Sequence, residues 1–274
     1  MDKVKFSVLL SIYYKEKPEY FRECMESIYL QTVLPDEIVL VEDGRLTEEL
    51  YEAIRDYECR PSEISFVTVK LEKNSGLGLA LAEGIKHCSN ELVARMDTDD
   101  ICVPDRFERQ LNAFNQNKNL DVVGGYIAEF DVDKEHITAE RKVPLNHKEI
   151  VSYQRKRDGL NHVTVMFKRR SVLESGNYKS CLLMEDSLLW ANMIKNHCHM
   201  ANLDKVLVYV RTGEDMLKRR GGFDYFLKYR EGRKTILMTG TISKSDYFIT
   251  VAVQLAVCMM PLWMRSLVFK KILR

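Results

Sequence analysis

The sequence lacks several of the short motifs that define protein classes. Its seven cysteines form no CxxC pair, and no GxGxxG or Walker phosphate-binding pattern occurs. An odd number of scattered cysteines argues against a disulfide framework and predicts reduced thiols in a cytoplasmic protein. No signal peptide, internal repeat or low-complexity tract is recognisable. We therefore expect one catalytic domain with a C-terminal appendage.

An excess of charge of one sign is also missing. The chain has 41 Lys and Arg against 40 Asp and Glu, so its net charge is +1. Dedicated nucleic-acid binders carry strongly basic surfaces, and we therefore expect no nucleic acid among the partners. The run His197-Cys198-His199 has no second ligand pair at zinc spacing, and we interpret it as a loop after a helix.

Apolar runs do alternate with helical periodicities over the first hundred residues. We expect strands over 4–12, 37–41, 64–69 and 92–96, and helices over 18–29, 47–57 and 76–87. This alternation predicts a parallel, doubly wound α/β sheet with right-handed crossovers. In the second half we expect helices over 104–117, 186–195 and 224–239, and strands over 122–126, 163–167 and 206–210.

Ligands of such sheets bind beyond the carboxyl ends of the strands. Three polar or aromatic strand endings should therefore converge, at Tyr13-Tyr14, at 42–44 and at 97–100. The last contains three carboxylates, on Asp97, Asp99 and Asp100, which repel one another unless a divalent cation joins them. Oxygen ligands suit Mg²⁺ or Mn²⁺. The alternative is a solvated acidic turn that precedes the helix beginning near Pro104.

Two weaker features accompany this cluster. Asp43 ends an earlier strand and could accept hydrogen bonds from a nucleobase or ribose, or serve ordinary turn chemistry with Gly44. The run from Asn74 to Gly78 precedes a helix whose N-terminus could attract phosphate. It matches no standard phosphate loop, and it could equally let the backbone approach a nucleotide.

The C-terminal region is apolar and basic. Nearly every residue from Tyr247 to Met264 is apolar, a length at the short edge of a membrane span. We expect a helix that lies on or dips into the membrane, with a buried core helix as the alternative. Upstream, Lys218, Arg219 and Arg220 form a cluster that contacts either a diphosphate or anionic lipid, or only solvent.

Taken in order, these stretches resemble the family 2 glycosyltransferases with the GT-A fold, especially bacterial enzymes of O-antigen and exopolysaccharide (amylovoran-type) assembly. The matching stretches cover roughly residues 4 to 215. They are 7–13, 41–44, 74–76, 95–100 with 104–106, and 184–186 with 189–190. The chain departs from the family pattern at Ser11, where proline is usual, at Glu42 and Arg45, and at Gly213, where a histidine is frequent.

The resemblance implies a role for each matching residue. The UDP-sugar donor would be bound by Ser11, Tyr13, Asp43, Asn74, Gly76, Arg95 and Asp97, with Asp43 on the uracil or ribose and Asp97 near the ribose. Asp99 would bind Mn²⁺ or Mg²⁺ on the diphosphate, with Asp100 nearby. Asp186 would be the catalytic base, with Glu185 as the alternative. The residues that contact the acceptor or the diphosphate would be Arg211, Lys218, Arg219 and Arg220.

It also implies a function and a location. We expect an inverting transferase that moves a hexose of the Glc or Gal type to a polyprenyl-diphosphate-linked saccharide. The expected domains are a GT-A catalytic domain over 1–215, with a nucleotide half (1–100) and an acceptor half (101–215), and a membrane-associated helical region over 216–274. The protein would be peripheral on the cytoplasmic face of the inner membrane. The alternatives are a DxD-type phosphatase or phosphotransferase and an inactive membrane-attached scaffold.

Overall fold

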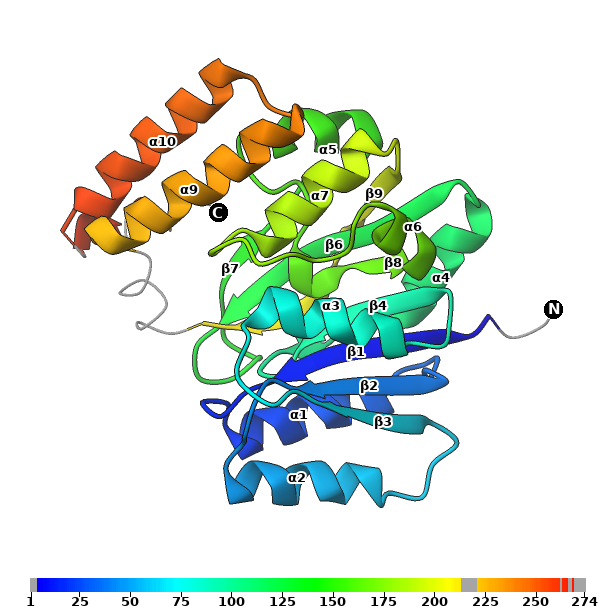
Figure 1. Cartoon of the computed structure of the whole chain (residues 1–274). Helices are drawn as coiled ribbons and strands as arrows, with labels where there is room; N and C mark the ends of the chain where they lie inside the picture. The colour runs from blue at the N-terminus through cyan, green and yellow to red at the C-terminus, as the bar shows by residue number, and fades with distance from the viewer. Residues whose placement is uncertain (1–3, 213–220, 262, 266–267, 269–274) are drawn as a thin grey trace.

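The computed structural model describes residues 4–212, 221–261, 263–265 and 268 (Figure 1). Its first half follows the predicted alternation closely. The elements are β1 (Phe6–Ile12), α1 (Pro18–Tyr29), β2 (Glu37–Glu42), α2 (Glu48–Glu58), β3 (Ser65–Lys70), α3 (Leu77–His87) and β4 (Leu92–Asp97). Pro18 opens α1, where a missing N–H costs nothing, and the Thr47 hydroxyl caps α2 by accepting from the Leu50 amide at 3.3 Å.

The second half contains more elements than the sequence predicted. In chain order they are β5 (Ile101–Cys102), α4 (Arg106–Gln116), β6 (Leu120–Phe130), β7 (Ile137–Arg141), α5 (His147–Gln154), the 3-10 turn η1 (His162–Thr164), β8 (Met166–Lys168), α6 (Arg169–Glu174), α7 (Glu185–Lys195), β9 (His199–Arg211), α9 (Phe223–Thr239) and α10 (Lys244–Met259). The predicted strand over 163–167 is wrong at its start. There the Thr164 hydroxyl donates to the Asn161 carbonyl at 2.8 Å, and this local bond accompanies a 3-10 turn.

All these strands join one sheet in the order β3-β2-β1-β4-β8-β6-β9-β5, with β7 paired to β6. The pairs from β3 to β4 are parallel, as predicted. Beyond β4 the sheet is mixed, because β8 runs antiparallel to both β4 and β6 while β9 runs parallel to β6. The expectation of a mostly parallel sheet is therefore correct for the first hundred residues and wrong for the second half.

Helices cover both faces of the sheet (Figure 1). Because side chains alternate along a strand, Val8 and Leu10 of β1 pack in one apolar cluster with α1, α2 and α4, and Leu9 packs in another with α3, α5, α6 and α7. Close packing on the second face depends on Gly84 of α3, where an added Cβ would lie 2.4 Å from a methyl carbon of Leu9. Two helical layers thus hold the sheet rigid beneath its carboxyl edge.

The C-terminal helices α9 and α10 form a hairpin beside this core (Figure 1). The hairpin is attached through a small third cluster, in which Met184 and Leu188 at the start of α7 meet Ile236 and Ile242. Helix α10 buries only Asp246, Thr250, Val257 and Cys258. The alternative of a fully buried core helix is therefore wrong. Among the described residues, no helix is both long enough and apolar enough to cross a bilayer.

Candidate active site

Three strand ends meet at one edge of the sheet, as the sequence predicted. The parallel register aligns Ser11 of β1 with Asp97 of β4, and Ile12 of β1 with Glu42 of β2. The next residue along β2, Asp43, donates its backbone N–H to the Ile12 carbonyl at 2.8 Å. Tyr13 follows directly after β1 and is partly exposed at this edge. The register thus brings the aromatic and acidic strand endings together at one edge of the sheet.

Asp43 organises the loop over 74–76. It is buried, and its two carboxylate oxygens accept the backbone N–H groups of Ser75 at 2.6 Å and Gly76 at 3.0 Å. The Asn74 side-chain amide donates to the Asp43 carbonyl at 3.2 Å. Gly44 has φ +85°, and a Cβ there would lie 2.6 Å from the Asn74 nitrogen. The backbone N–H groups of Ser75 and Gly76 therefore already have an acceptor. This weakens the interpretation of 74–78 as a phosphate loop and favours the alternative, in which the backbone of this stretch approaches a nucleotide closely.

Arg95 and Asp97 form a fixed ion pair at the end of β4. The Arg95 guanidinium is buried and donates through both terminal nitrogens to the two carboxylate oxygens of Asp97, with Nη1 to Oδ2 at 2.8 Å. A bidentate pair of this kind fixes the carboxylate plane as well as its position. About a third of the Asp97 side chain remains exposed toward the crevice.

Asp97, Asp99 and Asp100 present a cluster of carboxylate oxygens. Among the described residues they are a group in which one oxygen from each lies within 4.8 Å of the others. Burial and the Asp97 and Glu16 charges raise the pKa of Asp99 to about 7, and burial with the Asp99 and Asp97 charges raises the pKa of Asp100 well above its ordinary value. Three crowded hard oxygen donors of this type fit a divalent cation such as Mg²⁺ or Mn²⁺.

Glu185 and Asp186 begin α7 and face the same region. An added Cβ on Gly78, at the start of α3, would lie 2.9 Å from the Glu185 Cβ, so the first turn of α3 packs against Glu185. Burial and the nearby charges of Asp158 and Glu185 raise the pKa of Asp186 to about 8. Burial also raises the pKa of Glu185, while Arg95 opposes that rise. Both predicted base candidates therefore lie close enough to Arg95 for its charge to act on them.

Four further polar residues belong to this region and carry no sequence signal. Asp158 accepts the Ser187 hydroxyl at 2.5 Å and therefore lies beside Asp186. Glu16 accepts the Thr98 hydroxyl at 2.7 Å, and burial raises its pKa. Nε2 of His162 and the hydroxyl of Tyr178 form a hydrogen bond of 2.7 Å. Burial first and the charge of Arg95 second hold the pKa of His162 well below its usual range.

Of the predicted acceptor or diphosphate contacts, Arg211 lies at the site. Its backbone N–H donates to Asp100 at 2.8 Å and its Nε to the Asp99 carbonyl at 3.3 Å. The guanidinium stacks on Tyr20 at 3.9 Å from the ring centre and pairs with Glu23. Arg211 thus supports the acidic turn directly. Lys218, Arg219 and Arg220 lie outside the described residues. The run 197–199 connects α7 to β9, as expected.

The arrangement suits a reaction with two separate electrostatic tasks. The crowded oxygens at 97–100 attract a cation, which would hold an anionic group at the carboxyl edge of the sheet. The acidic pair that opens α7 offers a carboxylate with a raised pKa, which is a stronger proton acceptor when ionised than an ordinary one. A bound anionic group with a proton acceptor nearby suits transfer of a group from a phosphate ester to a hydroxyl.

Comparisons with known proteins point the same way. Residues 7–176 match the model of glycosyl transferase family 2. The chain is 38% identical over 248 residues to the amylovoran biosynthesis glycosyltransferase AmsE of Erwinia amylovora, covering 89% of this chain and 91% of that one. It is 33% identical over 273 residues to the Escherichia coli UDP-Gal:α-D-GlcNAc-diphosphoundecaprenol β-1,3-galactosyltransferase, covering 100% and 98%.

A solved structure shares the fold. The mannosyltransferase PcManGT of Pyrobaculum calidifontis, in complex with GDP-Man and Mn²⁺, aligns with a TM-score of 0.63 at 14% identity, covering 96% of this chain and 78% of that one. The α/β arrangement described above, a mixed sheet flanked by helices, is therefore GT-A-like.

Proposed function

Because the chain belongs to glycosyl transferase family 2, and is therefore a glycosyltransferase, we propose that it transfers a hexose from a UDP-sugar to a lipid-diphosphate-linked saccharide with inversion. The donor and acceptor follow from the E. coli relative, whose name gives UDP-Gal and a diphosphoundecaprenol acceptor and which aligns over the full chain. The Erwinia relative supports a place in exopolysaccharide, capsule or O-antigen assembly. Family membership is also the reason to set the phosphatase alternative aside.

One observation carries this proposal. The register of β1, β2 and β4 and the packing of Gly78 on Glu185 bring three separate acidic groups near the carboxyl edge of the sheet. In the donor half, Ser11, Tyr13, Asp43, Asn74 and Gly76 would line the nucleotide, and Arg95 would hold Asp97 beside the ribose. Since both oxygens of Asp43 already accept backbone N–H groups, any contact with the uracil or ribose would use a remaining lone pair.

The cation would be Mn²⁺ or Mg²⁺, held by Asp99 with Asp97 or Asp100 beside it. When bound, such an ion neutralises charge that develops on the leaving diphosphate. The chain's own part is to fix the oxygen donors. Arg95 holds Asp97 in a bidentate pair, and the Arg211 backbone N–H holds Asp100. Arg211 itself would act mainly by supporting this turn.

Asp186 would accept the proton of the acceptor hydroxyl as that oxygen attacks the anomeric carbon of the sugar. Its pKa of about 8 makes the ionised carboxylate a better proton acceptor near neutral pH than an ordinary Asp. Glu185, one residue earlier and packed against the first turn of α3, is the alternative base. Lys218, Arg219 and Arg220 remain candidates for contact with the acceptor diphosphate, on sequence grounds alone.

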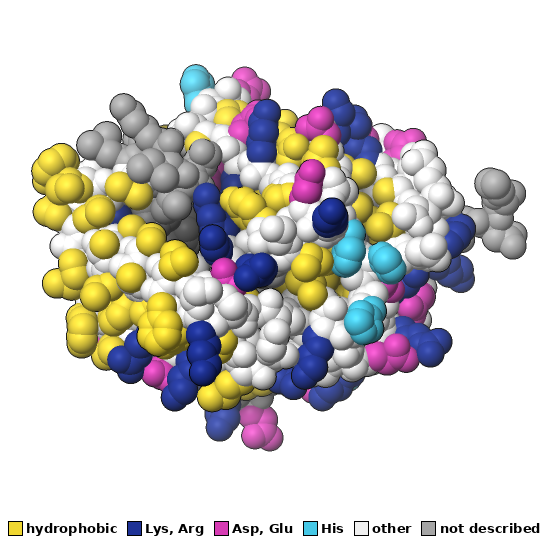
Figure 2. All heavy atoms as spheres, turned by 90° about the horizontal axis from the view of Figure 1, so that it is seen from above, with side chains coloured by type: hydrophobic (Ala, Val, Ile, Leu, Met, Phe, Trp, Pro, Cys, Tyr) yellow, Lys and Arg dark blue, Asp and Glu magenta, His cyan; other side chains and the backbone are white. Residues whose placement is uncertain are grey.

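The helices beyond residue 215 would dock the enzyme on the membrane that carries its acceptor. The exposed face of α10 presents Phe248, Ile249, Val253, Leu255 and Met259, and no charged side chain follows Asp246 in this helix. Figure 2 shows these hydrophobic side chains gathered over the α9–α10 end of the molecule. An apolar helix face of this extent suits the interfacial region of a bilayer. Seven free cysteines are consistent with the cytoplasmic face.

The test is hexose transfer by the purified full chain, with UDP-galactose as the first donor and GlcNAc-diphosphate-lipid as acceptor. We expect Mn²⁺- or Mg²⁺-dependent transfer, and a loss of roughly 10²- to 10⁴-fold in kcat for Asp99→Asn and for Asp186→Asn. Asp56→Asn, an exposed carboxylate on α2, is the matched control and should retain activity.

Calorimetric titration of the chain with UDP in the presence of Mn²⁺ tests the alternative of an inactive scaffold. A chain that binds UDP but transfers no hexose to any lipid-diphosphate acceptor contradicts the proposed reaction. A chain that binds no UDP supports the inactive scaffold. Near-normal kcat in Asp186→Asn would make Glu185 the next candidate for the base.

A further inference from the structure

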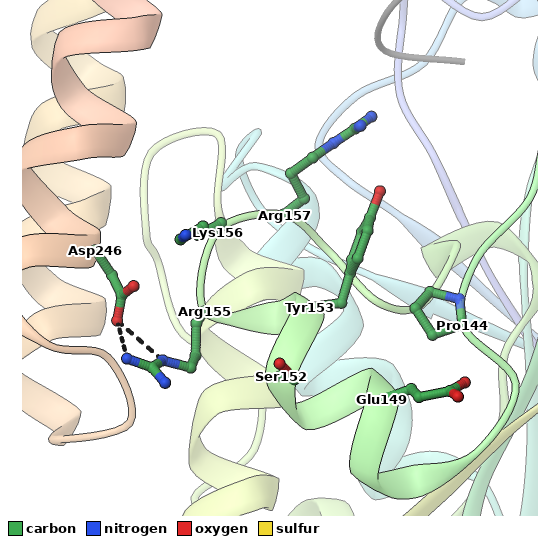
Figure 3. A pocket seen from close by; sticks show the side chains of 8 residues that line it. All are labelled: Pro144, Glu149, Ser152, Tyr153, Arg155, Lys156, Arg157 and Asp246. Atoms are coloured by element: carbon green, nitrogen blue, oxygen red, sulfur yellow. Dashed lines mark hydrogen bonds and ion pairs between the residues drawn. The ribbon is translucent and has the colours of Figure 1, made fainter.

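Two acidic side chains of this protein differ in how their charge is compensated. Asp246 is buried and accepts from Arg155 through Nε at 2.9 Å and Nη2 at 2.7 Å, so a cation compensates it (Figure 3). Glu16 lies between β1 and α1 and is partly buried. Among the described residues, its carboxylate accepts from two neutral groups, the backbone N–H of Lys17 at 2.8 Å and the hydroxyl of Thr98 at 2.7 Å.

The contact with Thr98 joins Glu16 to the acidic turn at 97–100. Thr98 is 3% exposed and lies between Asp97 and Asp99, two of the candidate cation ligands. The charges also act on one another. Burial raises the pKa of Glu16 and the charge of Asp97 adds to this rise, while the Thr98 hydrogen bond opposes it. Burial and the charges of Asp97 and Glu16 raise the pKa of Asp99 to about 7. Glu16 is therefore a fourth acidic group near this turn.

Helix α1, which follows Glu16, supports the same turn at other points. The Cys24 thiol donates to the Asp97 carbonyl at 3.3 Å. The ring of Tyr20 lies 3.9 Å from the guanidinium carbon of Arg211, whose backbone N–H donates to Asp100 at 2.8 Å. Tyr20 and Cys24 are four residues apart and therefore lie on one side of the helix. The start of α1 thus fixes the acidic turn in place, and Glu16 brings a negative charge to it.

This placement has opposite consequences with and without a cation. In the metal-free chain the like charges of Glu16, Asp97 and Asp99 repel one another, which destabilises the fold. A divalent cation at the turn is attracted by the same charge. Groups that orient metal ligands from outside the ligand set typically change metal affinity by about 10- to 100-fold.

We propose that Glu16 is a positioning residue of the cation site, which orients the turn at 97–100 through Thr98 and strengthens binding of Mn²⁺ or Mg²⁺ with its charge. The inference rests on the cation in the proposed function. It adds a residue from the segment between β1 and α1 to a site whose candidate ligands all follow β4 or end it.

Glu16→Gln tests the charge with little change in shape. The amide oxygen of glutamine can accept from the Lys17 N–H, and its nitrogen can donate to the Thr98 hydroxyl oxygen. Mn²⁺ binding to the purified full chain is measured at pH 8 by electron paramagnetic resonance, with and without UDP. We expect an affinity about ten-fold lower than that of the wild type. The melting temperature of the metal-free variant should be higher by about 1–3 °C, because the repulsion is reduced.

Two further variants complete the test. Glu19→Gln removes the same charge from an exposed position in the first turn of α1, and it should keep the Mn²⁺ affinity within about two-fold and not raise the melting temperature. Thr98→Val removes the hydroxyl at nearly constant shape and should also lower the Mn²⁺ affinity. The loss in the double variant of Glu16→Gln with Thr98→Val should be smaller than the product of the two single losses, because both residues act through one contact.

The proposal is overturned if Glu16→Gln binds Mn²⁺ as tightly as the wild type, or if Glu19→Gln loses as much affinity. A lower melting temperature in metal-free Glu16→Gln would also overturn it, since Glu16 would then support the fold and not the cation. Losses that multiply in the double variant would contradict the route through Thr98. A wild-type chain that binds no Mn²⁺, with or without UDP, contradicts the cation of the proposed function itself, which is a different result from equal binding by wild type and variant.

Discussion

Asp158→Asn should move the pH dependence of transfer toward lower pH. Asp158 lies beside the proposed base, because its Oδ1 accepts the hydroxyl of Ser187, which directly follows Asp186, at 2.5 Å. After burial, the charge of Asp158 is the main cause that raises the pKa of Asp186 to about 8. Asparagine keeps an acceptor oxygen for Ser187 and for the Gln154 amide while it removes the charge. The substitution therefore tests charge with little change in shape.

The size of the effect follows from the titration curve. With a pKa of about 8, Asp186 is ionised in roughly one molecule in ten at pH 7. Removing one neighbouring carboxylate should lower that pKa by on the order of one unit, which makes about half of the molecules competent. We expect kcat/KM at pH 7 to rise about five-fold and the plateau above pH 9 to stay within two-fold of the wild type.

The assay is kcat/KM for hexose transfer between pH 5.5 and 9.5, with melting temperatures recorded at each end. An acid limb that stays in place, or a loss of activity at every pH, would refute the reasoning. Glu185→Gln extends the test, because Glu185 also raises the pKa of Asp186. If Asp186 is the base, that variant shifts the limb in the same direction and keeps the plateau. If Glu185 is the base, the plateau collapses.

Three further outcomes are expected. Since the raised pKa of Asp99, about 7, favours its protonated form, the metal-free chain should lose stability as pH rises through 7. The rise in melting temperature caused by Mn²⁺ should accordingly be larger at pH 8 than at pH 6, and Asp99→Asn should abolish it. Asp43→Asn removes a charged acceptor from two loop amides, so the KM for UDP-sugar should rise about 10- to 100-fold in initial-rate assays. Gly84→Ala places a Cβ 2.4 Å from Leu9 and 2.6 Å from Val41, so chemical denaturation should show a loss of about 1–3 kcal/mol in the free energy of unfolding. The control Ala82→Gly changes the same helix without creating this steric clash.

The first hundred residues could be predicted because each element there has a clear local pattern. The β1 and β2 strands are mostly apolar and almost entirely buried, and α2 begins at a standard cap, Thr47. The strand order then follows from parallel crossovers, which is why the meeting of Asp43 and Asp97 at one edge could be foreseen.

The second half could not be predicted in this way, because its strand pairings depend on contacts between residues that lie far apart in the sequence. Strand β9 begins seven residues before the predicted 206–210, and it includes Asn202, a polar residue outside the predicted strand. Its side-chain nitrogen donates to the carbonyls of Pro144 at 2.6 Å and Gly159 at 2.8 Å, partners that lie far from it in the sequence. For the same reason, the sequence did not reveal Asp158 and Glu16. Each lies in an irregular segment and is joined to the site by a hydrogen bond with a residue far away in the sequence.

The position of the helical hairpin was foreseen only in outline. The apolar composition after Tyr247 predicted a membrane-facing helix, and the structure adds that α10 starts earlier, at Lys244, and packs one side on α9. The capping box at Ser243 and Asp246 defines that start. The prediction was based on the apolar run alone and therefore did not include this cap.

The most direct test of the central claim is the anomeric configuration of the product, determined by NMR after reaction of UDP-galactose with a GlcNAc-diphosphate-lipid acceptor. A single displacement at the anomeric carbon predicts a β-linked product from the α-linked donor, formed by the wild-type chain and lost in Asp186→Asn. An α-linked product, or a β-linked product formed at an undiminished rate by Asp186→Asn, would contradict this account.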